Sequence, residues 1–449
     1  MQSNQPIVSV AGLRGIVGQS FTAEIIVPYI CAFADLIKTK VVVVGGDSRP
    51  SREWAQPCVE AALRSRGVKV ISVGLAPTPT IGMLVREFNA GGGICITASH
   101  NPIEWNGLKF FHEEGGFLTP KHHEKLHALM EKPAAYKGSL QVGEYEKNAD
   151  AEKIHLAKLV AHLPPKPAKG RRKLRVVVDC CNAASSTLAP LIGMEYGCTP
   201  EVIFNNPGRP FPRGAEPLPE NIKVLCREVK RCNADFGVAI DPDADRLAVV
   251  DENGVPLGEE RTLVLCADAY LNIVGKKSPL VANLSSSMAM DHLAKKHGVE
   301  LFRSKIGEAH VTAMMEEHHS IVGGEGNGGV IIPAIHPGRD AATAFALLIL
   351  GMQSTRKKIS EWNTLVPQFI MVKTKVELGN LSVSETLKRA KEALKHADYI
   401  DETDGLKFLF PDSFLHIRPS GTEPILRIFV EATDKQKAKQ LIKEIQAIF

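Results

Sequence analysis

The sequence predicts an α/β protein of several domains that ends in a smaller α+β domain. At 449 residues the chain is too long for one hydrophobic core, and its length alone indicates about three domains, or four. An apolar strand, a small polar loop and a helix follow one another three times, at intervals of roughly a hundred residues. From about Val366 the order of elements changes. Although no strict repeat is present, these observations favour related α/β domains in series.

The first α/β domain is expected at residues 1–154. Hydrophobic periodicity predicts a helix at 22–38, and the apolar run Val41–Gly45 predicts a buried strand that ends in Asp47-Ser48-Arg49. A helix at 53–66 and a strand at 68–73 complete the alternation. Before them, Val10-Ala-Gly-Leu-Arg-Gly-Ile-Val-Gly18 is expected to be a loop. Its Arg14 suits a phosphate, but taken alone a surface turn with a solvated arginine is the simpler explanation.

One hydroxyl, that of Ser99, is expected at the tip of a sharp loop in Gly91-Gly-Gly-Ile-Cys-Ile-Thr-Ala-Ser-His-Asn-Pro102. Three glycines lead into a short apolar strand, and Asn101-Pro102 forces a turn because proline restricts the residue before it. A serine held in this way can be a covalent nucleophile or carrier if a neighbouring group activates it. For an isolated Ser-His pair a polar turn is the commoner explanation, so the assignment depends on the rest of the chain.

The same order of elements predicts two further α/β domains, at residues 155–257 and 258–367. In the first, the strand 174–178 ends in Asp179-Cys-Cys-Asn182 before a helix. In the second, the strand 279–282 ends in Asn283-Leu-Ser-Ser-Ser287 before a helix.

The last domain, residues 368–449, follows an α+β pattern. Strands and helices are expected in this order: a strand at 369–376, a helix at 382–396, strands at 414–418 and 426–432, and a terminal helix from Lys435.

Three carboxylates, Asp241, Asp243 and Asp245, alternate along a short loop between two apolar strands. Like charges this close are unfavourable unless something neutralises them, and a hard divalent cation with oxygen ligands does so. An EF-hand loop also begins D-x-D-x-D, but Arg246 stands where that loop needs glycine, and a strand follows at once. We therefore expect a metal site, with Arg246 beside the ion and suited to an anionic substrate.

Two glycine-rich or proline-rich loops suit a phosphorylated sugar. Gly323-Gly-Glu-Gly-Asn-Gly-Gly329 contains a formal dinucleotide fingerprint, but it enters another β-like run and not a helix. Its Glu325 and Asn327 suit sugar hydroxyls, although a flexible hairpin explains the loop equally well. Arg418-Pro-Ser-Gly-Thr-Glu-Pro424 combines an arginine, two hydroxyls and a free glycine N–H, which favours an anion cradle over a plain turn.

Composition narrows the class of protein. Hydrophobic residues make up 44% and charged residues 23%, and the formal net charge of +4 does not indicate a nucleic-acid partner. No leader-like N-terminal segment and no apolar run of about 18 residues is present, so we expect no membrane partner. The nine cysteines show no C-x-x-C spacing, which argues against zinc and a disulfide framework and indicates a cytoplasmic location.

Four of these segments together resemble one family, the α-D-phosphohexomutases, which include phosphoglucomutase, phosphomannomutase and phosphoglucosamine mutase. The resemblance covers essentially the whole chain. It rests on four motifs in the family's order and spacing: Thr97-Ala-Ser-His-Asn-Pro102, Asp241-Pro-Asp-Ala-Asp-Arg246, Gly324-Glu-Gly-Asn-Gly328 and Arg418-Pro-Ser-Gly-Thr-Glu-Pro424. It implies three similar α/β domains with mixed sheets and a smaller C-terminal domain, arranged around a central cleft.

The resemblance also implies a role for each motif. Ser99 corresponds to the family's phosphoserine, and a phosphoserine oxygen would join the three aspartates around one magnesium ion per chain. Lys109 is a candidate general acid/base, Arg14 and Arg246 lie near the reacting phosphate, and His100 helps to position Ser99. Glu325, with Asn327, corresponds to the sugar-hydroxyl contact. The residues that bind the non-reacting phosphate in the family correspond to Arg418, Ser420, Gly421 and Thr422.

The implied reaction interconverts a hexose 6-phosphate and a hexose 1-phosphate through a bisphosphorylated sugar, which also serves as activator. Asn327 stands where many members have serine, and Gly329 where they have histidine; this form resembles archaeal-type mutases and a subset of phosphoglucosamine mutases. Glucosamine phosphate is the favoured substrate, with glucose or mannose phosphate as the alternative. As a base for the sugar hydroxyl, Lys109 must lose its proton, and we expect a cationic site around it to lower its pKa. Two other functions stay open, a metal-dependent sugar phosphatase and a non-catalytic sugar-phosphate binder. The oligomeric state, monomer or dimer, also stays open.

Overall fold

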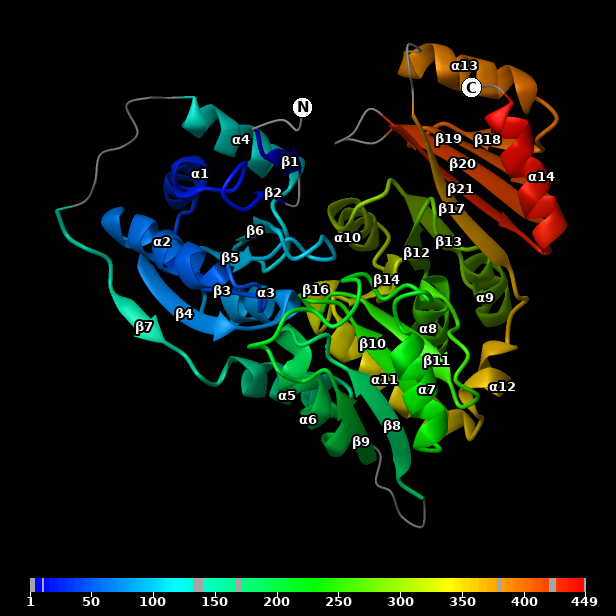
Figure 1. The fold of residues 1–449 in the computed structure, drawn as a ribbon, viewed down its shortest axis with the longest axis horizontal. Helices are drawn as coiled ribbons and strands as arrows, with labels where there is room; N and C mark the ends of the chain where they lie inside the picture. The colour runs from blue at the N-terminus through cyan, green and yellow to red at the C-terminus, as the bar shows by residue number, and fades with distance from the viewer. Residues whose placement is uncertain are drawn as a thin grey trace.

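The computed structural model describes residues 5–9, 12–131, 140–165, 172–377, 382–419 and 425–447. Within these ranges the strands form four sheets, one for each predicted domain. In Figure 1 the first sheet lies at the left in blue, the second and third lie in the centre in green and yellow, and the fourth lies at the upper right in orange and red. This is the predicted architecture of three α/β domains and a smaller α+β domain.

The first sheet is mixed and is covered by helices on both faces. Val42 and Val44 pack on one face and Val43 on the other, because successive side chains of a strand point in opposite directions. The helices are α1 (Ala23–Leu36), α2 (Arg52–Ser65), α3 (Thr78–Glu87) and α4 (Pro120–Met130). In spatial order the strands are β1 (Ile7–Ser9), β2 (Gly12–Ile16), β6 (Trp105–His112), β5 (Gly92–Ile96), β3 (Val41–Gly46), β4 (Lys69–Leu75) and β7 (Tyr145–Lys147).

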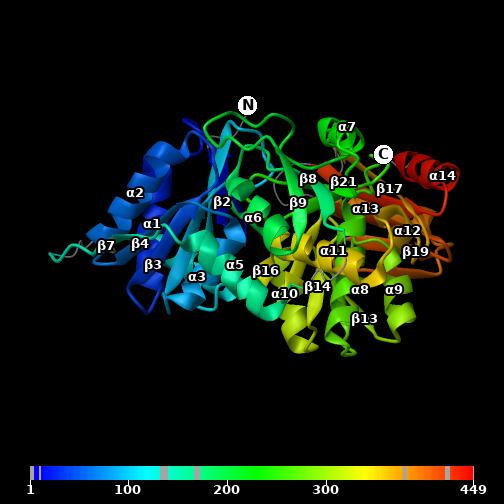
Figure 2. The ribbon, with the colours of Figure 1, turned by 90° about the horizontal axis from the view of Figure 1, so that it is seen from below.

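The second and third sheets share one continuous hydrophobic core. The second contains β11 (Leu247–Asp251), β10 (Phe236–Ile240), β8 (Leu174–Asp179) and β9 (Cys198–Ile203), and the third contains β13 (Leu301–Ser304), β12 (Leu280–Asn283), β14 (Val322–Glu325), β15 (Gly329–Ile332) and β16 (His336–Arg339). The helices are α5 (Ala151–His162), α6 (Leu188–Glu195), α7 (Lys223–Arg231), α8 (Glu259–Val274), α9 (Ala289–His297), α10 (Glu308–Glu317), α11 (Ala341–Thr355) and α12 (Ile359–Asn363). Figure 2 shows these central elements between the first and fourth sheets.

The fourth sheet is antiparallel throughout and has a core of its own. Its strands, in spatial order, are β17 (Ile370–Glu377), β21 (Ile425–Ala432), β20 (Ser413–Pro419), β19 (Leu406–Phe410) and β18 (Tyr399–Asp401), with helices α13 (Val383–Ala393) and α14 (Lys435–Gln446). Among the described residues no helix is long and apolar enough to cross a bilayer.

Three functional loops occupy the same place in their sheets. The Ser99 loop joins β5 to β6, the aspartate loop joins β10 to β11, and the Glu325 loop joins β14 to β15; each pair of strands is antiparallel. In each sheet the first strand of the pair also runs parallel to its other neighbour. The loops therefore leave the carboxyl ends of parallel strands, where α/β sheets place their ligands.

Two local predictions differ from the structure. Arg14 lies on strand β2, paired with Gly107 of β6, and not in a loop. The segment Gly323–Gly329, expected to be a loop, begins within strand β14 (Val322–Glu325), so Glu325 is the last residue of a strand. Both differences arise because glycines that read as loop signals sit in paired strands, where the backbones approach closely: a Cβ at Gly12 would lie 1.9 Å from the Leu108 carbonyl oxygen.

Candidate active site

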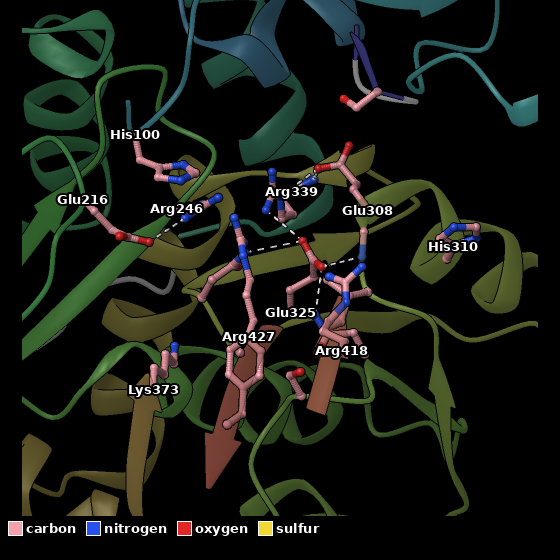
Figure 3. A pocket seen from close by; sticks show the side chains of 18 of the residues that line it. His100, Glu216, Arg246, Glu308, His310, Glu325, Arg339, Lys373, Arg418 and Arg427 are labelled. Atoms are coloured by element: carbon pink, nitrogen blue, oxygen red, sulfur yellow. Dashed lines mark hydrogen bonds and ion pairs between the residues drawn. The ribbon is translucent and has the colours of Figure 1, made fainter. Parts of the chain in front are cut away.

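A cleft of about 980 Å³ is lined by residues of all four predicted domains. Arg14 and His100 reach it from the first, Arg246 from the second, Glu325 from the third and Arg418 from the fourth. Figure 3 shows His100, Arg246, Glu325 and Arg418 around the cleft, with Arg339 near the centre. The structure thus brings the motifs together from opposite ends of the chain.

Ser99 lies at the bottom of a strained loop. It is buried, and its φ of +52° places a non-glycine residue in the left-handed region. Its N–H donates to the Thr97 hydroxyl over 2.9 Å, whereas its own Oγ has no hydrogen-bond partner within the described part of the chain. A buried hydroxyl without a partner is unusual in a folded protein and typical of a reactive or ligand-binding position.

Arg49 supports the Ser99 loop through its main chain, and it was not predicted from the sequence as a site residue. Its guanidinium donates to the main-chain oxygens of Ser99 and Asn101, both over 2.7 Å, and to that of Trp105 over 2.8 Å. Asp47 pairs with Arg49 at 3.1 Å and also accepts from Thr97. The signal was present in the predicted strand-ending sequence Asp47-Ser48-Arg49, because parallel strands β3 and β5 end at the same sheet edge.

In the second and third sheets, too, the functional loop is supported by the loop that joins the neighbouring parallel strand to its helix. In the second sheet the N–H of Ala184 donates to the Pro242 oxygen over 3.1 Å. In the third, the Asn283 amide donates to Glu325 over 2.8 Å, and Ser286 accepts from the Gly326 N–H over 2.9 Å. The three predicted strand–polar-loop–helix units therefore support the loops that line the cleft.

Asp241, Asp243 and Asp245 converge as predicted. They are fully buried, and one oxygen of each lies within 4.8 Å of the others. One oxygen of each carboxylate is satisfied: Asp241 accepts from the Arg246 N–H, Asp243 from Lys109 and Asp245 from Arg339. The second oxygen of each has no hydrogen-bond partner among the described residues.

These orphaned oxygens fit a hard cation. Three buried carboxylate oxygens that accept no hydrogen bond are donors of the kind that magnesium or calcium prefers, although Asp245 Oδ1 also lies 3.6 Å from Arg246 Nε. Burial and the charges of its two neighbours raise the pKa of Asp241 well above its usual value. Burial also raises that of Asp245, but Arg339, Lys109 and Arg246 outweigh it and lower the pKa below its ordinary range. A cation would relieve the repulsion among the carboxylates.

Lys109 lies inside the carboxylate cluster. Its Nζ donates to Asp243 over 2.6 Å and to Asp245 over 3.0 Å, and the side chain is 2% exposed. Burial lowers the pKa of Lys109, but the two carboxylates outweigh it, so its pKa is raised above the ordinary value. The expectation of a lowered pKa was wrong for this arrangement, because the nearest charges to Lys109 are anionic.

Cations line the side of the cleft nearest Ser99. Arg14 Nη1 donates to the Asn101 amide oxygen over 3.2 Å, and Arg246 pairs with Glu216 at 3.1 Å. Arg246, burial and Arg14 lower the pKa of His100 well below its usual value. These groups give the reacting end of the cleft a positive field suited to a phosphate.

Arg339 links the aspartate cluster to the Glu325 loop and was not foreseen from the sequence. Its three guanidinium nitrogens each contact a different carboxylate: Asp245 at 2.7 Å, Glu325 at 2.8 Å and Glu308 at 2.9 Å. Figure 3 shows the Arg339 guanidinium close to Glu308 and Glu325. Glu325 is also bonded to Asn283, whereas Asn327 lies beside it and accepts from the Gly329 N–H over 3.2 Å.

Gly329 explains how Arg339 reaches this position. A Cβ at residue 329 would lie 2.1 Å from Arg339 Cδ and 2.7 Å from Cγ. Any side chain there, including the histidine that many family members carry, would collide with the arginine. Glycine at position 329 therefore leaves room for the buried side chain of Arg339.

The fourth sheet presents a row of cations to the cleft. Arg418 on β20 lies opposite Arg427 on β21, which in turn lies opposite Lys375 on β17, and all three line the cleft. Like charges on neighbouring strands are unfavourable unless an anion lies among them. Arg418 Nε is 3.5 Å from Asp404. The predicted partners of Arg418, namely Ser420, Gly421 and Thr422, lie outside the described residues.

The Asn283–Ser287 loop also connects the third and fourth sheets. Ser285 bonds to His416 over 2.9 Å, the N–H of Met288 donates to Glu431 over 2.7 Å, and Lys407 donates to the Leu284 oxygen. The loop that braces Glu325 thus also fixes the sheet that carries Arg418.

Known proteins share this organisation. Family models of phosphoglucomutase/phosphomannomutase match in order: α/β/α domain I at residues 6–137, domain II at 155–254, domain III at 259–369 and the C-terminal domain at 373–448. A phosphoglucomutase/phosphomannomutase of Thermococcus kodakarensis is 37% identical over 439 residues, which cover 96% of each chain.

Two further relatives extend the comparison. A probable phosphoglucosamine mutase of Methanopyrus kandleri is 32% identical and covers 97% of this chain and 95% of its own. The crystal structure of a putative phosphomannomutase from Thermus thermophilus superposes with a TM-score of 0.84 at 25% identity, over 98% of both chains. With the four domain models matched in order and relatives aligned over almost its whole length, the chain belongs to the phosphoglucomutase/phosphomannomutase family and is a phosphohexomutase.

Proposed function

We propose that this protein is a phosphoglucosamine mutase, which interconverts glucosamine 6-phosphate and glucosamine 1-phosphate through a phosphoserine at Ser99. The observation that carries the phosphoserine assignment is the buried Ser99 Oγ without a hydrogen-bond partner, on a loop that faces a cleft rich in cations. The choice of sugar is supported by the Gly324–Gly329 loop form and by a relative named as a probable phosphoglucosamine mutase.

Magnesium would be held by Asp241, Asp243, Asp245 and a phosphoserine oxygen, one ion per chain. When bound it neutralises charge on the transferring phosphoryl group. The donor set described above supports this assignment, because each aspartate keeps one oxygen unused. Arg14 and Arg246 add positive charge at the same end of the cleft.

In the proposed reaction the P–O bond to Ser99 Oγ breaks as a bond forms to a sugar hydroxyl oxygen. Lys109 relays the proton: Nζ gives one to Ser99 Oγ and takes the one that the hydroxyl releases. His100 helps to position the loop. The bisphosphorylated sugar then turns over and returns its other phosphate to Ser99, which restores the phosphoserine; a bisphosphorylated hexose also primes the enzyme.

The remaining residues hold the sugar during this turnover. Glu325 and Asn327 accept and donate hydrogen bonds to ring hydroxyls, and Arg418 with Ser420, Gly421 and Thr422 grips the phosphate that is not reacting. The assignments place one group in each of four proposed domains, 1–154, 155–257, 258–367 and 368–449. Closure around the substrate excludes water, which would otherwise convert transfer into hydrolysis.

Phosphoglucomutase/phosphomannomutase activity is the second candidate, because the 37% identical relative carries that name. A coupled assay across glucosamine, glucose and mannose 6-phosphates, with a bisphosphorylated activator, decides between them. Highest kcat/KM on glucosamine 6-phosphate supports the proposal, whereas highest kcat/KM on either other sugar overturns the choice of substrate.

Intact-mass measurement tests the mechanism. We expect one phosphate on the wild-type chain, lost on mixing with hexose monophosphate, and none on Ser99→Ala, which should also lose essentially all turnover. Net release of inorganic phosphate would instead indicate a sugar phosphatase. Binding without phosphate exchange would indicate a sugar-phosphate binder, and wild-type turnover by Ser99→Ala would contradict the assignment of Ser99.

A further inference from the structure

Glu308 differs from the other carboxylates that line the cleft. It begins helix α10, is 8% exposed, and directs Oε2 to the N–H and Nε of Arg339 over 3.2 and 2.9 Å. The hydrogen bonds of Glu308 within the described ranges all use Oε2 and none uses Oε1, and Glu308 lines the cleft. Figure 3 shows this carboxylate beside the Arg339 guanidinium.

Arg339 fixes Glu308 next to the proposed sugar contact. One guanidinium bonds both Glu325 and Glu308, and the N–H of Gly307, the residue before Glu308, donates to Glu325 over 3.0 Å. The two carboxylates are therefore neighbours on one wall of the cleft. A hexose that presents one ring substituent to Glu325 presents an adjacent substituent to Glu308.

We propose that Glu308 Oε1 accepts a hydrogen bond from the C2 ammonium group of glucosamine phosphate and so selects an amino sugar over a neutral hexose. This inference rests on the proposed function. An aliphatic amine of this kind carries a proton at neutral pH, as α-amino groups with a pKa of about 7.7–8.0 do. Burial raises the pKa of Glu308 to about 7, and an ammonium partner favours the charged carboxylate, which a neutral hydroxyl does not. The charge-assisted bond so formed is stronger than a bond from a neutral hydroxyl.

The other acidic groups on the cleft wall are less suited to this role. Glu325 accepts from Asn283 and Gly307 with one oxygen and from Arg339 with the other. Glu260 contacts Lys373 and accepts from the Ser287 N–H. Glu216 pairs with Arg246 and has no contact with the Arg339–Glu325 wall among the interactions of the described residues. Among the described carboxylates that line the cleft, Glu308 is the one that has an oxygen outside the hydrogen bonds described above and shares Arg339 as a partner with Glu325.

The test compares Glu308→Gln with Glu216→Gln, a matched loss of an arginine-paired cleft carboxylate. For each protein, kcat/KM is measured on glucosamine 6-phosphate and on glucose 6-phosphate. We expect Glu308→Gln to lower the glucosamine-to-glucose ratio of kcat/KM by roughly ten- to a hundredfold, even though both activities fall. Glu216→Gln should leave the ratio within about twofold of the wild type.

Each outcome is decisive. An unchanged ratio in Glu308→Gln, with the wild type preferring glucosamine, overturns the role of Glu308 and leaves the proposed function intact. A wild type that prefers glucose or mannose phosphate overturns the substrate assignment, and this inference with it. If Glu308→Gln is too unstable to assay, Glu308→Asp is the second variant: it keeps the charge but shortens the reach, and an unchanged ratio in it also overturns the proposal. The KM values for the 6- and 1-phosphates then report in which sugar orientation the contact forms.

Discussion

The guanidinium of Arg49, which does not line the cleft, donates to the main-chain oxygen of Ser99 over 2.7 Å. The same guanidinium bonds the Asn101 and Trp105 oxygens and pairs with Asp47. Every nitrogen of the group is used, so one buried side chain determines the conformation of the loop. Because Ser99 has a positive φ, this support offsets backbone strain that the loop alone would not keep.

Arg49→Lys should therefore lower turnover by about ten- to a hundredfold and destabilise the protein by about 2–4 kcal/mol, since an ammonium cannot reproduce the planar fork. Mutase assays and thermal unfolding measure the two effects. Arg64→Lys is the control, because Arg64 donates through Nε to the Gly143 oxygen, far from the cleft. Wild-type turnover in Arg49→Lys would show that the loop keeps its shape without this support.

Asp241→Asn separates metal binding from folding. Asp241 accepts two backbone N–H groups with Oδ1, which asparagine retains, while its unpartnered Oδ2 is replaced by an amide nitrogen. Since the raised pKa of Asp241 shows that its charge is unfavourable in the fold, the variant should be at least as stable as the wild type without metal.

Magnesium should raise the melting temperature of the wild type, by an amount equivalent to about 2.7 kcal/mol at one hundred times Kd. It should not stabilise Asp241→Asn, and turnover should be lost in this variant and in wild type treated with a chelator. Equal stabilisation of both proteins by magnesium would place the ion elsewhere.

Gly329→Ala should displace Arg339, because the new Cβ would lie 2.1 Å from its Cδ. Breaking the buried contacts to Asp245, Glu325 and Glu308 should cost about 3–5 kcal/mol and reduce turnover. Gly193→Ala is the control: its Cβ would have ordinary contacts from 3.4 Å, and alanine favours the helix α6 in which it lies. Gly329→His should behave no better than Gly329→Ala; full activity in Gly329→His would contradict this packing.

Acid should weaken the contact between the third and fourth sheets. Burial lowers the pKa of His416 to about 4; its Nε2 donates to the Asp404 oxygen and its Nδ1 accepts from Ser285. The unfolded chain takes up this proton near pH 6.5, but the folded protein does so only near pH 4.

Stability is therefore complete above pH 6.5 and falls between pH 6.5 and 4, by up to about 3 kcal/mol for this group. Urea unfolding across this range measures the loss, and His416→Asn should show a shallower pH dependence. His336, whose pKa burial lowers to about 3, contributes a similar slope that the variant retains. Identical slopes in the two proteins would contradict the assignment to His416.

Most of the fold could be read from the sequence, because buried strands such as Val41–Gly46 and Phe236–Ile240 carry continuous apolar runs between clear loop signals. The convergence of Asp241, Asp243 and Asp245 followed from their spacing. The strand that carries Arg14 was not predicted, because its glycines are typical of a loop in the sequence. In the structure they allow a close approach to the backbone of the neighbouring strand.

The residues that hold the site were harder to foresee. Arg49 bonds Ser99, 50 positions away, and Arg339 bonds Asp245, 94 positions away. No local pattern shows which distant carbonyl or carboxylate a buried arginine meets. The pKa of Lys109 depended on the same long-range geometry: the sequence indicated nearby arginines, but two aspartates are closer to its Nζ.

The shared core of the second and third sheets has a consequence for how the protein loses function. Phe236, at the start of the strand that leads to the aspartates, packs edge-on against Phe345 of α11 at 6.2 Å, and both belong to one apolar cluster. The aspartate loop and the Glu325 loop therefore belong to a single cooperative unfolding unit, whereas the cores beneath Ser99 and Arg418 are separate. Heat or mutation that unfolds this unit would disrupt the aspartate loop and the Glu325 loop in the same event, so a partly unfolded chain would not keep one loop intact without the other.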